Sequence, residues 1–389
     1  MADLLFVTWG GAGNQVPTIG VAVAAARRGH RVTVAGYADQ RSRFESHGFA
    51  FRTLERAQRR WPSAPPQDWM PVLADVVWAC PDHLDDVADL LSTGEYDAMV
   101  VDCLMFGVLA AAERIGVRTA VLVHSAPGAL APPRGGFEQL LMPGVDRVRT
   151  AAGLPAIARM WDAWSPFPTF CTSMRELDPL ADALPSGIEF VGPVFEPIAG
   201  SEWRSPWAAQ DTRPLVIVSF STGPAWDQQS RIRRTVDALG DGSYRLLVTT
   251  GPFDVPDLDR PGVVTARHVP HGQVLPGAAV TVTHAGHGTV AASLSHGVPL
   301  VALPNPAADQ PALAAQVERL GAGIALDGET ATPDQIAEAV RTVRADPSFA
   351  ASARSLADRI GLMPRASGAV ALLGDLAAEH TGPGTTSKG

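Results

Sequence analysis

The chain has 389 residues, of which 46% are apolar and 18% charged, a balance typical of a globular protein long enough for two hydrophobic cores and not of a disordered chain. Its formal net charge of −9 argues against nucleic acid as a partner, because phosphate backbones require a basic protein surface. An anionic ligand must then be held by a local site.

Cysteine usage and the apolar runs indicate the compartment. Cys80, Cys103 and Cys171 lie far apart and form no metal-binding or redox motif, so we expect reduced thiols in a core. The longest apolar run, residues 16–26, is too short to span a bilayer, and no basic segment precedes the first strand. We therefore expect a soluble cytoplasmic protein with no membrane partner.

In chain order, the first half alternates apolar strands with helices. The pattern predicts strands at 4–8, 31–35, 98–102 and 118–123, a tight loop at 10–14, and helices at 16–28 and 107–115. This alternation favours parallel strands that are buried on both faces. Two stretches rich in Trp or Pro, 61–78 and 127–168, interrupt the alternation and are predicted as surface loops near the carboxyl ends of the strands.

The second half repeats this alternation after a boundary near residues 190–197. We expect a first domain at 1–195, a linker at 196–212 and a second domain at 213–365. Strands are predicted at 215–221, 244–249, 263–266, 280–284, 300–303 and 323–325. A capping box from Thr332 to Gln335 opens a helix that runs to about Arg344. A last helix, 366–380, can cross back to the first domain, and composition predicts a disordered tail at 381–389.

The stretch from His284 to Gln310 carries the clearest functional signal. A Gly-rich turn joins a strand end to a helix expected to begin at Gly288, where backbone N–H groups and the helix dipole favour an anion. About 20 residues later, Asp309 and Gln310 offer hydrogen-bonding groups suited to sugar hydroxyls. A diphosphate joined to a sugar fits this layout better than a bare phosphate.

This stretch resembles the donor-binding signature of family 1 nucleotide-sugar glycosyltransferases, the GT-B enzymes that decorate plant metabolites and bacterial antibiotics. The pattern H-x-G-x-G-T, then G-V-P, then D-Q is matched at His284, Gly286, Gly288, Thr289, Gly297, Val298, Pro299, Asp309 and Gln310. Weaker matches at 10–17, 192–193 and 219–222 extend the resemblance over nearly the whole chain. It implies an α/β GT-B fold, in which two Rossmann-like domains with parallel sheets face each other across a cleft. The first domain would bind the acceptor and the second the donor.

The resemblance also implies the donor-binding residues. They are Ser221, Thr222, Val269, His284, Gly286, His287, Gly288, Thr289, Asp309 and Gln310. His284 would stabilise the charge that develops on the leaving diphosphate, and the backbone of Val269 would bond the nucleobase. The stretch around Val269 can instead be purely structural. The two nearby histidines could suggest a metal pair, but no third ligand has suitable spacing, so we expect no metal.

The nucleobase preference depends on one position. Plant members carry a glutamate, eight positions after the signature histidine, that bonds both ribose hydroxyls, and here that position is Ala292. Losing this acceptor removes a reason to prefer ribose over deoxyribose. The resemblance therefore favours a dTDP-sugar over a UDP-sugar.

The general base departs from the family pattern. The acceptor-side loop G-x-x-G-[His/Asp]-x-x-P is matched at 10–17, but Asn14 stands where the family often has a basic histidine, and an amide cannot accept the proton. Asp102 and His124 end neighbouring predicted strands. We hypothesise that Asp102, His124 or both take the acceptor proton, while Asn14 orients the acceptor hydroxyl. Alternatively, Asp102 caps a helix and His124 is a buried imidazole, or the acceptor is acidic enough to need little help.

Aromatic residues and methionines in the first-domain loops predict a wide apolar pocket for a bulky acceptor. The residues assigned to it are Trp69, Trp78, Phe106, Met142 and Trp161. The alternative is that these side chains belong to an ordinary core.

We therefore expect an inverting, metal-independent glycosyltransferase that moves a sugar from a nucleoside diphosphate to an apolar small-molecule natural product. It would need no cofactor beyond the nucleotide-sugar co-substrate and would act as a monomer or homodimer. Two alternatives remain open, namely a catalytically silent nucleotide-sugar-binding helper of a partner transferase and a GT-B nucleotide-sugar epimerase.

Overall fold

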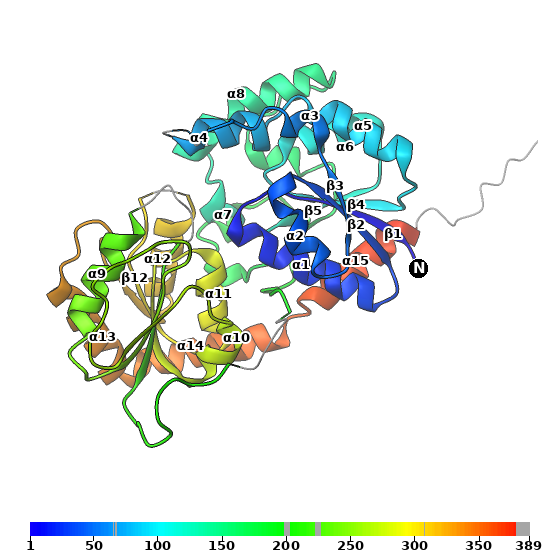
Figure 1. Cartoon of the computed structure of the whole chain (residues 1–389). Helices are drawn as coiled ribbons and strands as arrows, with labels where there is room; N and C mark the ends of the chain where they lie inside the picture. Colours follow the sequence, from blue (N-terminus) through cyan, green and yellow to red (C-terminus); the bar gives the residue numbers. More distant parts are fainter. Residues whose placement is uncertain (65, 67, 198–202, 222–226, 307, 379–389) are drawn as a thin grey trace, which may run out of the picture.

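The computed structural model describes all residues except 65, 67, 198–202, 222–226, 307 and 379–389. Two α/β units lie side by side, one built from the blue-to-cyan half of the chain and the other from its green-to-orange half (Figure 1). We call them the N-terminal and C-terminal domains. The predicted fold class, two parallel sheets each flanked by helices, is confirmed.

The N-terminal domain is built on a parallel sheet. In the described residues it has seven strands in the order β3-β2-β1-β4-β5-β6-β7. Their bounds are Asp3–Val7 (β1), Arg31–Gly36 (β2), Ala50–Thr53 (β3), Ala98–Asp102 (β4), Thr119–Val123 (β5), Thr169–Cys171 (β6) and Ile188–Phe190 (β7). Strand order reverses between β1 and β4, and ligands of open α/β sheets bind at such a switch point, outside the carboxyl ends of the strands.

Helices cover both faces of this sheet. They are Ala12–Arg27 (α1), Arg41–Glu45 (α2), Glu55–Gln58 (α3), Trp69–Val72 (α4), His83–Thr93 (α5), Phe106–Ile115 (α6), Pro127–Leu130 (α7) and Gly136–Ala151 (α8). The expected loop at 10–14 is wrong in its second half, because α1 already begins at Ala12 and Asn14 therefore lies in its first turn.

The predicted loop at 127–168 is also wrong over much of its length. Helix α8 occupies 16 of these residues and buries Leu141, Val145 and Val148, which share one helical face at the i, i+4 and i+7 spacing. Its internal Pro143 obscures that periodicity in the sequence. The stretch at 61–78 likewise contains α4 and a π-helical turn at Leu73–Trp78. Helices therefore form part of both segments.

The C-terminal domain has a second parallel sheet. Its described strands have the order β10-β9-β8-β11-β12-β13. They are Leu215–Ser219 (β8), Arg245–Thr249 (β9), Val263–Ala266 (β10), Ala278–Thr283 (β11), Leu300–Ala302 (β12) and Gly323–Ala325 (β13). The helices are Gln228–Leu239 (α9), His271–Val274 (α10), His287–Ser295 (α11), Gln310–Arg319 (α12), Pro333–Ala345 (α13) and Pro347–Leu362 (α14).

Two features connect the domains. Helix α15 (Ala366–Ala378) returns to the N-terminal domain (Figure 1). There Val370 and Leu373 pack with Phe6 of β1 in one hydrophobic core. A separate apolar cluster joins Met174 of the N-terminal domain to Leu294 of α11. The domain boundary is therefore packed beside the carboxyl ends of the first sheet. The expected tail at 381–389 lies outside the described residues.

Candidate functional site

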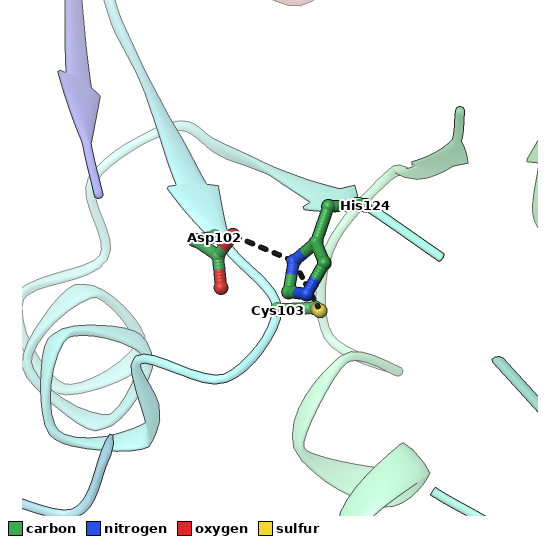
Figure 2. Close-up of side chains that lie close together, drawn as sticks. All are labelled: Asp102, Cys103 and His124. Carbon is green, nitrogen blue, oxygen red and sulfur yellow. Dashed lines mark hydrogen bonds and ion pairs between the residues drawn. The ribbon is translucent and has the colours of Figure 1, made fainter. Parts of the chain in front are cut away.

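Asp102 and His124 form a hydrogen-bonded pair at the carboxyl edge of the N-terminal sheet. Asp102 is the last residue of β4, and His124 directly follows the neighbouring parallel strand β5. The Nδ1 atom of His124 lies 2.8 Å from Oδ2 of Asp102 (Figure 2). Because the two strands are adjacent and parallel, their ends bring the two side chains to one place.

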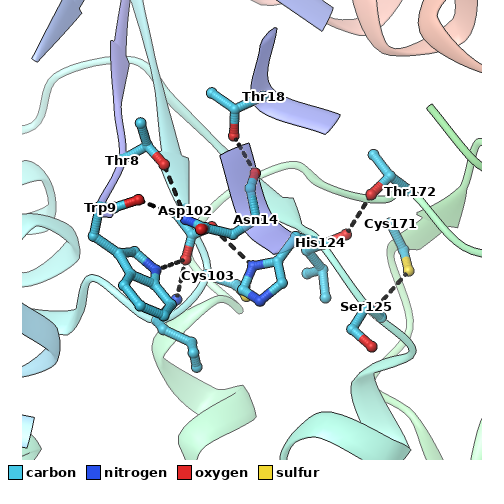
Figure 3. Close-up of polar contacts among 12 residues, drawn as sticks. Thr8, Trp9, Asn14, Thr18, Asp102, Cys103, His124, Ser125, Cys171 and Thr172 are labelled. Carbon is cyan, nitrogen blue, oxygen red and sulfur yellow. Dashed lines mark hydrogen bonds and ion pairs between the residues drawn. The ribbon is translucent and has the colours of Figure 1, made fainter. Parts of the chain in front are cut away.

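The Asp102 carboxylate is held by further donors. The indole Nε1 of Trp9 donates to Oδ1 over 3.0 Å, and the backbone N–H of Leu104 donates to the same atom over 3.1 Å (Figure 3). The side chain of Asp102 is fully shielded from solvent. A carboxylate with this many donors is fixed in orientation and can hold the imidazole beside it in one tautomer.

Asn14 joins the same network from the first turn of α1. Its Nδ2 lies 3.1 Å from Thr8 Oγ1, 3.1 Å from the Trp9 carbonyl oxygen and 3.3 Å from Asp102 Oδ2. Its Oδ1 is buried and has no hydrogen-bond partner in the described part of the chain. Asn14 thus positions Asp102 and leaves one amide oxygen able to accept a hydrogen bond (Figure 3).

The pair with Asp102 sets the charge of His124. Burial alone lowers the pKa of an imidazole, but the negative charge of Asp102 and their hydrogen bond raise the pKa of His124 well above its usual 6.5. Nδ1 faces Asp102, so Nε2 is the ring nitrogen that can take a proton from a ligand. About a tenth of the side chain, 11%, remains exposed.

The residue after His124 reaches the other domain. The Ser125 hydroxyl donates to Oδ2 of Asp309 over 2.5 Å, and Asp309 precedes α12 of the C-terminal domain. Burial raises the pKa of Asp309, while the bond from Ser125 and the charge of His124 oppose that rise. The proposed base therefore lies where the two domains meet.

Five of the expected donor residues lie on the tight turn after β11 and at the start of α11, namely His284, Gly286, His287, Gly288 and Thr289. Ala285 has a positive φ of 62°, and α11 begins at His287, one residue before the predicted start. A Cβ on Gly286 would lie 2.4 Å from Nε2 of His284, so the imidazole needs glycine there. A Cβ on Gly288 would meet nothing within 4 Å, which leaves open space at the start of α11.

Burial keeps the imidazoles of this turn neutral. Burial lowers the pKa of His284 to about 4, although a hydrogen bond with the Ser219 backbone acts to raise that pKa. Burial also lowers the pKa of His287 to about 3, and the nearby charge of His124 adds to that effect. Nε2 of His287 is buried without a partner among the described residues. The charge of His124 thus acts on His287 from the other domain.

The remaining donor candidates that the structure describes are buried or only partly exposed. Gln310 is buried, and its Oε1 accepts from the backbone N–H of Asn305 over 3.1 Å. Val269 is buried in a small apolar cluster with Val274. Thr289 and Ser221 are partly exposed, whereas Thr222 lies outside the described residues. Asp309 and Gln310 therefore both already have protein partners.

The acceptor candidates divide into two groups. Trp78, Phe106 and Trp161 are at most 4% exposed and belong to the main core, so the pocket expectation gives way to the core alternative for these three. The physical reason is that α8 and the turn Met160–Ala163 cover this face of the sheet. Met142 is partly buried and packs against that core, and the partly buried Trp69 contacts the ring of Trp61 at a centroid distance of 5.9 Å.

Sequence reasoning missed Trp9. It follows β1 at the carboxyl edge of the sheet, bonds Asp102, and its ring stands edge-on to Trp78 at 5.4 Å and to His124 at 6.5 Å. The sequence could have indicated Trp9 as a site residue, because an aromatic residue directly after the first strand of an α/β domain lies where such folds bind ligands.

Comparison with known proteins finds similarity to glycosyltransferases. Residues 226–375 match the family model described as erythromycin biosynthesis protein CIII-like, C-terminal domain. The chain is 30% identical over 214 residues to a 3-alpha-mycarosylerythronolide B desosaminyl transferase from Saccharopolyspora erythraea, covering 53% of this chain and 50% of that relative. It is 29% identical over 320 residues to a 4'-demethylrebeccamycin synthase from Lentzea aerocolonigenes, covering 71% and 73%. The match thus spans only half the length of the first of these relatives.

Solved structures share the fold over nearly the whole chain. The glycotransferase of kitacinnamycin superimposes with a TM-score of 0.78 at 23% identity, covering 96% of this chain and 98% of that one. The calicheamicin glycosyltransferase CalG4 gives a TM-score of 0.77 at 22% identity, with coverages of 98% and 100%. The fold is therefore that of the GT-B glycosyltransferases.

Both sequence relatives make antibiotic-type natural products, and the matched family model covers residues 226–375. The chain is therefore similar to bacterial glycosyltransferases of natural-product biosynthesis. Among the described helices, none is both long and apolar enough to cross a membrane.

Proposed function

We propose that this protein transfers a sugar from a nucleoside diphosphate to an apolar small-molecule natural product, with inversion at the anomeric carbon and without a metal. The observation that carries the proposal is the Asp102–His124 pair, held at the domain boundary beside Asp309 and facing the turn at His284–His287. Such a displacement needs two parts. They are a base on the acceptor side and an anion-binding helix start on the donor side.

His124 is the general base in this mechanism. As an acceptor hydroxyl attacks the anomeric carbon, its proton moves to Nε2 of His124, and the bond from that carbon to the diphosphate oxygen breaks. Asp102 keeps Nδ1–H oriented and stabilises the imidazolium that forms. Attack from the side opposite the leaving group gives inversion. The proton stays on His124 until it is lost to solvent.

The proposed basic imidazole thus follows strand β5, whereas the resemblance implies a histidine at the start of helix α1. Where the family often has a histidine in the first turn of α1, Asn14 donates to Asp102, and the basic ring is supplied from the end of β5. The buried, unpartnered Oδ1 of Asn14 can accept a hydrogen bond from the acceptor hydroxyl and so orient it. Asn14 is therefore a positioning residue.

On the donor side, the start of α11 receives the diphosphate. The space beside Gly288, the N–H groups of the first helical turn and the imidazole of His284 support this placement. Asp309 and Gln310 take the sugar hydroxyls, so donor binding must compete with the Ser125–Asp309 bond. We favour a dTDP-sugar because Ala292 has no ribose-binding carboxylate, and one structure with this fold, VinC, is described in complex with dTDP. The free, buried cysteines fit a cytoplasmic location.

The test is a transfer assay with the purified full-length chain. We expect a panel of dTDP- and UDP-sugars, combined with apolar polycyclic and macrolide acceptors, to yield products heavier by one sugar in mass spectrometry. Nuclear magnetic resonance should show that the anomeric carbon of the product has the configuration opposite to that of the donor. If the chain binds nucleotide but neither transfers nor hydrolyses any donor, the catalytically silent helper is favoured, an alternative that Asn14 keeps open.

A further inference from the structure

Three side chains at the carboxyl edge of the first sheet have the chemistry of a metal-binding site. A carboxylate oxygen of Asp102, Sγ of Cys103 and a ring nitrogen of His124 all lie within 4.8 Å of one another (Figure 2). They are the one such group in the part of the chain that the structure describes. We propose that Asp102, Cys103 and His124 form a binding site for a thiophilic divalent cation of the Zn²⁺ class, which inhibits the protein when it binds.

The spacing of the sulfur and nitrogen atoms fits tetrahedral zinc. With Zn–S near 2.3 Å and Zn–N near 2.05 Å, a tetrahedral angle places the two ligand atoms about 3.6 Å apart. Here Sγ of Cys103 lies 3.7 Å from Nδ1 of His124. The oxygen of Asp102 is closer, at 2.8 Å from the same nitrogen, and must move away by roughly 0.5 Å to reach ligand spacing.

The surroundings hold these ligands in place. Asp102 and Cys103 are consecutive residues at the end of β4, and the indole of Trp164 donates to the Cys103 carbonyl oxygen over 2.8 Å. Trp9 and the Leu104 backbone orient the carboxylate. Such outer partners raise metal affinity because they reduce the reorganisation of the ligands. Three protein ligands leave a fourth tetrahedral position for water.

Sulfur selects the class of metal. A thiolate with an imidazole and one carboxylate favours Zn²⁺ or Co²⁺ over Mg²⁺ and Ca²⁺, which prefer oxygen ligands alone. On binding, the Cys103 thiol gives its proton to solvent. The proton on Nδ1 of His124 leaves to solvent from the imidazolium, or moves to Nε2 in the neutral ring, and the cation takes the freed lone pair on Nδ1. This step involves no change of oxidation state.

Inhibition follows from that replacement and rests on the proposed function. A cation on Nδ1 breaks the hydrogen bond to Asp102, so the imidazole can no longer take up a proton and share its charge with the carboxylate. The binding of the metal does not depend on the proposed function. The two claims can therefore fail separately.

The binding test uses Co²⁺ as the probe on the metal-free full-length protein. A thiolate bound to Co²⁺ gives a near-ultraviolet charge-transfer band that the chain's other carboxylates and imidazoles cannot produce. We expect one equivalent of Co²⁺ to give this band in the wild type and in Cys171→Ser, whose cysteine is also buried, on strand β6 two positions from β4 in the sheet. Cys103→Ser should lose the band, bind Co²⁺ at least tenfold more weakly, and keep the unfolding temperature of the wild type.

Two results would overturn the site. One is the absence of the band in the folded wild type, and the other is an equal band in Cys103→Ser. If Cys103→Ser does not fold, His124→Gln removes a different ligand and must weaken Co²⁺ binding to a similar extent. Retained tight binding in that variant also overturns the proposal.

The inhibition test is a turnover assay with micromolar Zn²⁺. We expect wild type and Cys171→Ser to lose activity, and Cys103→Ser to resist Zn²⁺ at least tenfold better. If Co²⁺ binds through Cys103 but Zn²⁺ leaves turnover unchanged, inhibition is refuted together with the role of His124 as base. A chain with no transfer activity at all refutes the proposed function, while the Co²⁺ test still decides the metal site.

Discussion

The Ser125 hydroxyl donates to the Asp309 carboxylate across the domain boundary, and the residue before Ser125 is the histidine paired with Asp102. The segment after β5 thus contacts both domains, since it carries His124 at the first sheet and bonds Asp309 of the C-terminal domain. If Asp309 moves when the proposed donor binds, the segment that carries His124 must respond. The proposed function then connects acceptor activation and donor binding through these two neighbouring residues.

This bond should contribute to stability. We expect Ser125→Ala and Asp309→Ala each to lower the free energy of unfolding, with a coupling energy of about 1–2 kcal/mol between them in a double-mutant cycle. Urea unfolding followed by tryptophan fluorescence measures it. Simple additivity of the two single variants would show that the hydrogen bond contributes nothing in solution.

Loss of the proposed base should reduce turnover strongly. We expect His124→Gln to lower kcat by about 10²–10⁴-fold, because general base catalysis has that magnitude, with little change in the KM for the donor. Cys80→Ser is a suitable control, since that cysteine is buried in the same core without contacting the pair. A His124→Gln variant with near-normal kcat would exclude this histidine as the base.

The activity should depend on pH through the same imidazole. The base acts in its neutral form, and Asp102 raises the pKa of His124 well above 6.5, so kcat/KM should fall as the pH falls through that raised value. Asp102→Asn removes the charge and leaves burial, which lowers the pKa, so the limb of the profile should move to lower pH as the rate drops. An unshifted limb in Asp102→Asn would contradict this pairing.

Two glycines offer a matched test of the donor turn. In Gly286→Ala the new Cβ would lie 2.4 Å from Nε2 of His284 and so force the imidazole to move. This variant should bind dTDP at least tenfold more weakly and should unfold at a lower temperature. Gly288→Ala meets nothing in the free protein, so it should keep the unfolding temperature of the wild type and still weaken dTDP, whose diphosphate we place there. Calorimetric titration measures both, and unaltered binding in Gly288→Ala would move the diphosphate elsewhere.

Nucleotide binding should also take up a proton. Burial holds the pKa of His284 near 4, and an anionic diphosphate beside it favours the charged imidazole, so its pKa rises on binding. Affinity for dTDP should therefore increase as the pH falls from about 8 to 5, and His284→Gln should flatten that dependence. Calorimetry in two buffers of different ionisation enthalpy reports the proton directly.

Much of the fold was predictable because the strands are short apolar runs with clear ends. The bounds predicted for β4, β10 and β13 agree with the structure to the residue. The capping box was also confirmed, since Thr332 Oγ1 accepts from Gln335 N over 3.3 Å and the glutamine side chain returns the bond. The edge strands β3 and β7 were missed, since four or fewer residues with partly exposed side chains leave little apolar pattern.

The candidate site was predictable only in part. Asp102 and His124 follow consecutive strands, so sequence alone could suggest that they lie near each other. Their contacts with Trp9 and Cys103 depend on strand order and on side-chain packing, which no spacing in the sequence encodes. The contact between Ser125 and Asp309 depends on how two domains dock, a property of surfaces far apart in the chain.

Helix α15 has a practical consequence for how the protein is handled. Its apolar face completes the core beneath β1 in a domain built from the opposite end of the chain. Shortening the polypeptide at residue 365 should therefore unfold the N-terminal domain first, although the cut lies next to the C-terminal domain. Conversely, a fragment ending before the linker will lack part of its own interior, and supplying the second half in trans should restore its solubility.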